Sequence, residues 1–338
     1  MRGEDGWRQK RQKAPKAGSR LSSEQRFGFV HDVCNRSSMM MAAEGNNNIV
    51  RYIYRGEEGE RIPRRVTHVY VENLAAVRAR AFQHRPNIQE VICHAGVERI
   101  EEYAFYWCPS LRRVIIPGVK EVEKKAFGSC FALTYIECGK LEIIGEAAFN
   151  GCRSLRNTSL PSIRIVQSSA FGGCKSLTNA KLGKGLESIR RSAFNNCTSL
   201  ERIALPLKDR MIIDDRIFNK CLKLSHIDLV EGALLHETVA SLLMEKWKKD
   251  MNEEIDSINR ILRNTHSGND YNIVGGKARE IRAWIESVHR KIIKYKGEHQ
   301  HTLSVAAETL QTALTNDIVF KNVLPFVELP SYTFEGEI

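Results

Sequence analysis

The sequence predicts an α/β repeat array followed by an α-helical hairpin. A short phrase (a small residue, Phe, two free positions, Cys, two free positions, Leu) recurs between residues 74 and 229, and its seven phenylalanines stand 22 to 24 residues apart. A period of this length is typical of a solenoid that grows by stacking repeats. After Gly232 the period ends, and two amphipathic stretches of helix-forming residues replace it.

Composition and charge restrict the class of protein. Of the 338 residues, 27% are charged and 42% hydrophobic, as in ordinary soluble domains. No apolar run approaches the roughly 18 residues that cross a membrane, and the first residues lack the apolar core of a secretory signal. We therefore expect an intracellular protein, cytoplasmic or nuclear, with no signal peptide and no membrane span.

The net charge of +11 is concentrated in two places, the N-terminal residues and the repeats. Residues 1–26 carry eight basic and three acidic side chains, and residues 62–233 carry 26 basic and 17 acidic ones. We predict that residues 1–43 form a disordered basic tail, because they contain too little apolar surface to offset the cost of ordering. Whether this tail is solvated, a targeting signal or a polyanion-binding segment stays open.

Residues 44–73 are predicted to be a β-hairpin that caps the N-terminal end of the array. β-Branched and aromatic residues from Ile49 to Tyr54 are followed by the turn-forming sequence 56–60 and by a second valine-rich run. An atypical terminal unit is needed because the first repeat of a solenoid would otherwise expose its core.

The repeats themselves occupy residues 74–232. Each begins with a short strand in which the leucine and the residues three and five positions later are apolar, as in Leu200, Ile203 and Leu205. Alternation within the strand predicts one inward face. A second apolar pair follows, and the Phe-containing turn after it has a length that suits a single helical turn.

Six of the nine cysteines fall at one phase of the repeat and are expected to stack as reduced, buried thiols. The sequence has no Cys-x-x-Cys pair, which argues against zinc and redox sites. The sequence 275–278 (Gly-Gly-Lys-Ala) lacks the remaining residues of a phosphate-binding loop and is interpreted as a loop and helix start. We predict no catalytic residue, no cofactor and no metal.

Residues 233–315 are predicted to form an antiparallel helical hairpin with coiled-coil-like apolar seams. The seam of the first helix runs at 3-4-4-3-4 spacing from Met244 to Leu262. It could close on the hairpin itself, on the last repeat or on a partner helix, so oligomerisation through the hairpin stays open. Residues 316–338 are predicted to be a C-terminal strap or tail, in which residues 323–330 are apolar and broken by proline and either pack back onto the body or form a short docking motif.

The full repeat pattern, Leu-x-x-Val-x-Ile-Pro followed by Ala-Phe-x-x-Cys, is clearest from Leu111 to Pro117 and from Ala126 to Cys130. It resembles the leucine-rich repeat of BspA-like proteins, also called the type 5 repeat, over residues 66–230. The resemblance implies a right-handed solenoid with a parallel sheet along one face. It also implies that the partners are other proteins, whose identity the sequence does not give.

The positions that flank the inward residue of each strand are expected to face solvent, including Ile92 and Ile115. From these positions we select as a candidate protein-binding face Glu90, Arg113, Tyr135, Glu137, Asn157, Asn179, Lys181, Arg202 and His226. Mixed charge with Tyr, His and Arg suits a protein surface, whereas a nucleic-acid surface should repeat Lys and Arg among aromatic platforms.

The sequence thus predicts a non-catalytic protein-interaction scaffold that binds through the strand face of its repeats. The alternative is a polyanion-binding protein that holds RNA, DNA or acidic lipid with its basic tail and repeat surface. No nucleic-acid motif supports that alternative.

Overall fold

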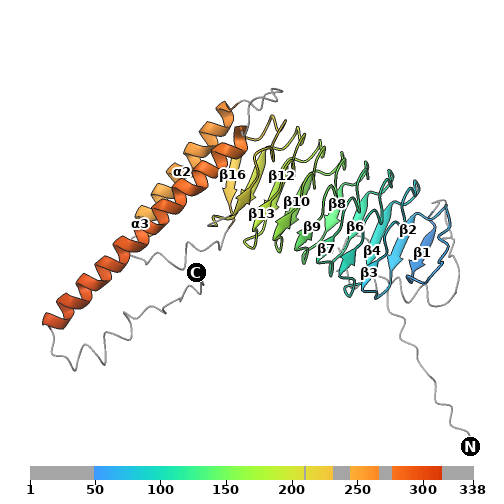
Figure 1. Cartoon of the computed structure of the whole chain (residues 1–338), viewed down its shortest axis with the longest axis horizontal. Helices are drawn as coiled ribbons and strands as arrows, with labels where there is room; N and C mark the ends of the chain where they lie inside the picture. The colour runs from blue at the N-terminus through green and yellow to red at the C-terminus, as the bar shows by residue number, and fades with distance from the viewer. Residues whose placement is uncertain (1–48, 209–210, 231–243, 266–275, 314–338) are drawn as a thin grey trace, which may run out of the picture.

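The computed structural model describes residues 49–208, 211–230, 244–265 and 276–313. Figure 1 shows an elongated stack of short strands with a pair of long helices at its C-terminal end. The predicted basic tail (1–43) and C-terminal strap (316–338) lie outside the described residues.

Most of the repeats contribute one strand to each of two parallel sheets. The first sheet contains β1 (Arg51–Tyr54), β2 (His68–Val71), β4 (Glu90–Cys93), β6 (Arg113–Ile115), β8 (Tyr135–Glu137), β10 (Asn157–Leu160), β12 (Asn179–Leu182), β14 (Arg202–Leu205) and β16 (His226–Leu229). The second contains β3 (Ala76–Val77), β5 (Arg99–Ile100), β7 (Glu121–Val122), β9 (Ile143–Ile144), β11 (Ile165–Val166), β13 (Ser188–Ile189) and β15 (Ile212–Ile213). The resemblance implied a sheet along one face, and the second apolar pair of each repeat adds the other.

The predicted strand alternation is confirmed. In β14, Ile203 and Leu205 are buried in the core while Arg202 is exposed. Pairing is in phase from repeat to repeat, so Ile203 lies beside Ile227 of the next strand. The first sheet has one interruption, because β8 and β10 are not paired and the sheet divides into a five-stranded and a four-stranded part.

The turn around each repeat phenylalanine, here called the Phe turn, is not helical, contrary to the prediction. Tyr103 and Trp107, two residues before and after Phe105, have φ angles of 57° and 59°, and such left-handed residues interrupt a right-handed helical turn. The backbone bonds between repeats instead: the N–H of Phe105 donates to the carbonyl of Ala126 and that of Trp107 to Gly128, each at 2.8 Å. The Phe turns therefore form a third hydrogen-bonded stack beside the two sheets.

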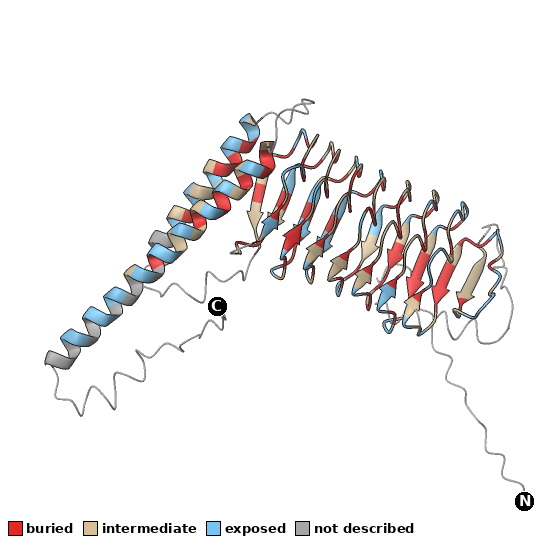
Figure 2. Cartoon of the chain, viewed as in Figure 1, coloured by how far each residue is buried: buried red, intermediate tan, exposed pale blue. Residues whose placement is uncertain are grey.

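The phenylalanines form one buried column of parallel rings. Neighbouring ring centroids are 4.8 to 5.8 Å apart, with interplanar angles from 0° to 21°. The column consists of Phe82, Phe105, Phe127, Phe149, Phe171, Phe194 and Phe218. At its N-terminal end the ring of Tyr54 lies edge-on to Phe82, with centroids 5.0 Å apart. Figure 2 shows the resulting band of buried residues running along the stack.

The six repeat cysteines also stack in a buried column, and each donates a hydrogen bond that the sequence did not suggest. The Sγ of Cys108 lies 3.1 Å from the carbonyl oxygen of Phe82, one repeat back, and Cys221 bonds to Phe194 at 3.0 Å. The remaining pairs are Cys130 with Phe105, Cys152 with Phe127, Cys174 with Phe149 and Cys197 with Phe171. An alanine would fill similar space but leave the carbonyl without this donor.

The prediction of a β-hairpin in residues 44–73 is wrong. β1 and β2 are parallel, with Arg51 beside His68, whereas a hairpin is antiparallel. Residues 55–67 form a complete coil that returns the chain to the same end of the sheet, and parallel strands require a connection of about this length. β1 therefore extends the solenoid by one more strand.

The two helices, α2 (Met244–Asn264) and α3 (Gly276–Ala313), form the predicted antiparallel pair. Trp284 Nε1 donates to the backbone carbonyl of Glu254 at 3.1 Å, and the hydroxyl of Tyr295 donates to the carboxylate of Asp250. Buried residues of both helices belong to the same hydrophobic core as the repeats. The seam thus closes both within the helix pair and on the last repeat, which settles two of the three open alternatives.

Each helix supplies one side-chain hydrogen bond to an edge strand at the C-terminal end of a sheet. β16 and β15 are the terminal strands of their sheets, so one row of their backbone groups has no further strand to pair with. The Oδ1 of Asn259 on α2 accepts the N–H of Ile227 at 2.8 Å. On α3, a guanidinium nitrogen of Arg282 donates to the carbonyl of Ile213 at 2.8 Å.

Lys277, in the first turn of α3, performs the same role for the last Phe turn. Its Nζ donates to the carbonyl of Cys221 at 3.4 Å and to that of Leu224. The side chain is buried among apolar residues, and this burial lowers the pKa of the amine. This is the lysine of the partial phosphate-loop pattern, and its amine donates to backbone carbonyls of the last Phe turn.

Substitution of one ring of the phenylalanine column tests its contribution. Phe149→Ala should lower the free energy of unfolding by about 3–5 kcal/mol, because the cavity opens between two stacked neighbours. Phe131→Ala is the control, since this half-buried ring stands outside the column and should cost about 1 kcal/mol or less. Urea unfolding of both variants gives the comparison, and equal losses would contradict a special role for the column.

The capping role of Lys277 predicts a second difference. Lys277→Met keeps the length of the side chain but removes the donor to the carbonyl of Leu224 and leaves that of Cys221 with only the N–H of Leu224, which should cost about 1–3 kcal/mol. Arg279→Met, two residues away and exposed, should change stability by no more than about 0.5 kcal/mol. Denaturant unfolding measures both, and a neutral Lys277→Met would remove the lysine from the cap.

Candidate functional site

The nine candidate residues lie on the side of the first sheet that faces away from the core, here called the outer face. In-phase pairing places Glu90 beside Arg113 and Arg113 beside Tyr135. Beyond the interruption of the sheet, a second column contains Asn157, Asn179, Arg202 and His226. Glu137 and Lys181 lie two residues further along their strands, on the same face. The fold therefore brings all nine onto one continuous side of the solenoid.

The N-terminal half of the outer face is less open than the sequence predicts. Ile92 and Ile115 are 4% and 0% exposed and pack with Tyr70 in an apolar cluster separate from the main core. The prediction that both isoleucines face solvent is therefore wrong. Their strands read as unbroken apolar runs, 91–93 and 114–116, and such runs are typical of strands buried on both faces. These apolar runs in the sequence could therefore have predicted that both isoleucines are buried.

The charged residues of this half form a local network around Glu90. One carboxylate oxygen lies 3.5 Å from Nε of Arg113, and the other lies 3.8 Å from Nε2 of His68. The guanidinium of Arg113 lies over the ring of Tyr135, 5.3 Å from its centroid, and the Tyr135 hydroxyl donates to Glu137 at 3.3 Å. Burial lowers the pKa of His68, against the opposing effect of Glu90. Most of these groups are half-buried and already partnered.

The C-terminal half is polar and exposed. Asn157, Asn179 and Lys181 are exposed on β10 and β12, and the Nδ2 of Asn179 donates to Oδ1 of Asn157 at 2.9 Å. Arg202 makes a bidentate pair with Asp228, at 3.1 and 2.6 Å. These side chains form a polar strip on β10, β12 and β14, and Tyr135, which is 47% exposed, lies across the interruption on β8.

No reactive constellation is assembled in the described part of the chain. Within residues 49–208, 211–230, 244–265 and 276–313, no group of three His, Cys, Asp or Glu side chains is placed to hold a metal ion. Burial raises the pKa of four repeat thiols, those of Cys108, Cys130, Cys152 and Cys174, to about 12 for Cys108 and Cys174, so they stay protonated and are poor nucleophiles near neutral pH.

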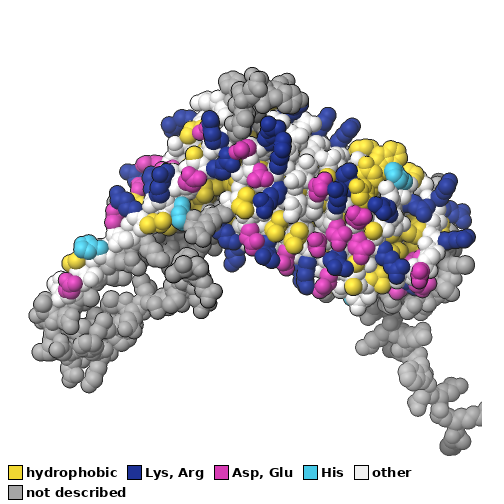
Figure 3. All heavy atoms as spheres, in the orientation of Figure 1, with side chains coloured by type: hydrophobic (Ala, Val, Ile, Leu, Met, Phe, Trp, Pro, Cys, Tyr) yellow, Lys and Arg dark blue, Asp and Glu magenta, His cyan; other side chains and the backbone are white. Residues whose placement is uncertain are grey.

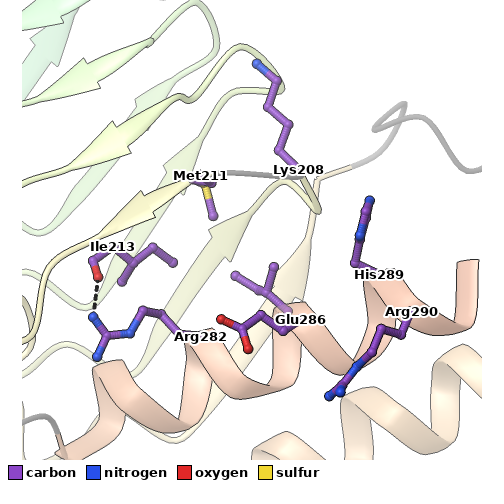
Figure 4. A pocket seen from close by; sticks show the side chains of 8 residues that line it. Lys208, Met211, Ile213, Arg282, Glu286, His289 and Arg290 are labelled. Carbon is purple, nitrogen blue, oxygen red and sulfur yellow. Dashed lines mark hydrogen bonds between the residues drawn. The ribbon is translucent and has the colours of Figure 1, made fainter. Parts of the chain in front are cut away.

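A pocket of about 420 Å³ lies where the last irregular repeat meets α3. Figure 4 shows that its charged side chains do not converge: Lys208 and Arg290 extend in different directions, and Arg282 is bonded to the carbonyl of Ile213. The pocket is a gap between the repeats and the C-terminal helix pair, and it lacks the convergent polar groups expected of a substrate site.

The described geometry is that of a solenoid repeat protein with an exposed strand face. The family described as a BspA type leucine-rich repeat region matches six copies, in residues 75–162 and 142–239. The chain therefore carries BspA-type leucine-rich repeats, and the resemblance drawn from the repeat phrase is confirmed. Proteins with such repeats are generally non-catalytic scaffolds for protein interaction.

Two of the solved structures to which this chain is similar are leucine-rich repeat proteins. One from Bacteroides ovatus ATCC 8483 is 25% identical, with a TM-score of 0.39, over 54% of this chain and 42% of that one. One from T. pallidum is 22% identical, with a TM-score of 0.41, over 60% of this chain and 84% of that one. The chain thus spans less than half of the first protein. A comparison with curated proteins gives no match.

Neither described helix combines the length and apolarity needed to cross a bilayer.

The raised pKa of the thiols predicts how stability depends on pH. The unfolded chain loses thiol protons from about pH 8.5, whereas the folded chain retains them. The stability that these four thiols contribute is therefore fully present below about pH 8.5 and falls as the pH rises, by up to about 1.4 kcal/mol per pH unit for each of them.

Urea unfolding between about pH 8 and pH 10.5 measures this slope. Cys174→Ala should be less stable at neutral pH and should show a slope that is shallower by one thiol. Because all other titrating groups are shared, an identical slope in the two proteins would contradict the assignment.

Proposed function

We propose that this protein is a non-catalytic scaffold that binds another protein through the C-terminal half of its outer face. The observation that carries the proposal is the exposed polar strip of Asn157, Asn179 and Arg202, held in fixed register by the parallel sheet, with the exposed Tyr135 next to it across the interruption of the sheet. A rigid surface loses little conformational entropy on binding, which favours affinity.

The composition of the strip also supports a protein partner. Tyr and Arg are enriched at protein interfaces and among the residues that dominate binding energy. The N-terminal half of the outer face is a weaker candidate, since Ile92 and Ile115 are buried and Glu90 and Arg113 are half-buried. We therefore assign the central contact to Tyr135, Lys181 and Arg202.

Polyanion binding is less well supported. Many basic side chains of the repeats pair with an acidic residue of a neighbouring repeat, among them Lys120 with Glu98 at 2.8 Å and Lys124 with Glu146 at 2.9 Å. Figure 3 accordingly shows both signs of charge interspersed over the visible side of the solenoid. A polyanion would be better held by a continuous basic surface.

We also propose that the protein works inside the cell, in the cytoplasm or nucleus. The cysteine column supports this compartment, because each of its hydrogen bonds needs a reduced thiol as donor and a reducing compartment preserves thiols.

The test is a quantitative pull-down from the native cell. The variant Tyr135→Ala/Lys181→Ala/Arg202→Ala should recover its specific partner at least tenfold less efficiently, the loss expected when central contact residues are truncated. The control Lys140→Ala/Lys184→Ala/Leu222→Ala removes the same number of charges and one exposed hydrophobic side chain away from the outer face. Its recovery should equal that of the wild type.

Equal recovery by both variants would exclude the outer face as the site. Recovery of the tagged protein from the medium rather than from the cell fractions would contradict the assigned compartment.

A further inference from the structure

An exposed aromatic cluster lies on the Phe-turn edge of the first two repeats, away from the outer face. We call it the aromatic patch; it consists of His84, Tyr103, Tyr106 and Trp107. The His84 ring lies 5.4 Å from Trp107 and 5.8 Å from Tyr106, and Tyr106 lies 5.4 Å from Tyr103. Figure 3 shows hydrophobic side chains gathered beside a histidine along the edge of the solenoid near its N-terminal end.

The position that His84 and Trp107 occupy has a positive φ in every repeat, so the fold requires this conformation but does not require a bulky side chain there. His84 and Trp107 have φ angles of 57° and 59°, a region that disfavours bulky side chains. The equivalent positions of later repeats are filled by Ser129, Gly151, Gly173, Asn196 and Lys220, several of them small or suited to positive φ. Burial does not offset this strain, since Trp107 is 44% exposed. Bulky residues held in such a conformation cluster at functional sites.

Two cations mark one end of the patch. The guanidinium of Arg80 and the ammonium of Lys125 lie 5.2 and 5.6 Å from the centroid of the Tyr103 ring. Arg80 also forms an ion pair with Glu102 at 3.4 Å. The patch therefore combines an exposed tryptophan, two tyrosines and positive charge. This combination fits a ligand with apolar or aromatic anchors next to carboxylates.

We propose that the aromatic patch of one copy binds residues 323–338 of a second copy. That segment contains Glu328, Glu335 and Glu337 and no Lys or Arg, and it also offers the rings of Phe326, Tyr332 and Phe334. Its acidic and aromatic composition complements the patch in both charge and anchor chemistry. Two prolines, at 325 and 330, restrict its backbone and reduce the entropy lost on docking.

The arrangement of the molecule favours a second copy over the same one. The C-terminal end of α3 and the first repeats lie at opposite ends of the structure (Figure 1). Within one copy, residues 314–322 and the segment after them would have to run back along the whole solenoid. Between copies the contact is head-to-tail, so each molecule offers one patch and one segment, and association can continue beyond a dimer.

A nucleic acid is less well matched to the patch. His84 to Tyr106 and Tyr106 to Tyr103 are edge-to-face contacts, with interplanar angles of 87° and 77°. The rings therefore pack against one another and do not present a series of open parallel platforms for bases.

The experiment is sedimentation velocity on the full chain over about two decades of concentration centred near 10 µM, where a single short-segment contact is expected to dissociate. The wild type should form concentration-dependent species larger than a dimer. The patch variant His84→Gly/Trp107→Gly and the tail variant Glu328→Lys/Glu335→Lys/Glu337→Lys should each associate at least tenfold more weakly.

Mixing the two variants provides the decisive arm. The patch variant retains an intact tail and the tail variant retains an intact patch, so the mixture should form heterodimers and no larger species. Glycine is expected to relieve the strain at both patch positions, so thermal unfolding should show the patch variant to be at least as stable as the wild type, which separates loss of binding from loss of fold.

A monomeric wild type, undiminished association of either variant, or a mixture that remains monomeric would each overturn the proposal. Wild-type assembly that disappears on nuclease treatment would overturn it in favour of a nucleic-acid ligand. The patch and the outer face share no residue, so this result is independent of the proposed scaffold function.

Discussion

The stacking distance between neighbouring phenylalanine rings is the constraint on which the rest of the structure depends. Parallel strands lie about 4.8 Å apart, and the rings in the middle of the column follow at 5.2 to 5.4 Å. Each repeat must therefore return its Phe, Cys and Leu to the same place after one coil. The two sheets, the Phe turns and the cysteine bonds all repeat at this spacing, and every one of them depends on the same register.

The first and last strands of such a stack have no further repeat to pair with, and the chain covers the two ends in different ways. At the N-terminus an additional parallel strand extends the first sheet, and Tyr54 covers the last ring edge-on. At the C-terminal end the elements that follow β16 in the described residues are helical, and none of them continues the sheets. Single side chains, Asn259, Lys277 and Arg282, take the place of the missing backbone partners, and apolar helix residues continue the core.

Packing within the stack restricts which residues can face the core. Residues that determine function can therefore vary only on the outer face and in the turns. The outer face divides where the sheet does, into a half with a buried apolar cluster and a half with exposed polar side chains. The Phe turns tolerate any residue that accepts a positive φ. Bulky residues such as His84 and Trp107 at these positions lower the stability of the fold, and they supply the exposed rings of the aromatic patch.

The sequence alone determined the repeat period, the inward strand positions, the cysteine column and the helix pair, because these depend on contacts that recur at a constant separation along the chain. Only the tertiary structure decided the parallel placement of β1 and the role of Lys277. Both depend on contacts between residues far apart in the sequence, which do not recur along the chain. Lys277 meets Cys221 and Leu224 from more than fifty positions away, and neither the spacing nor the chemistry of a lysine in a Gly-Gly-Lys sequence indicates that it completes the end of a solenoid.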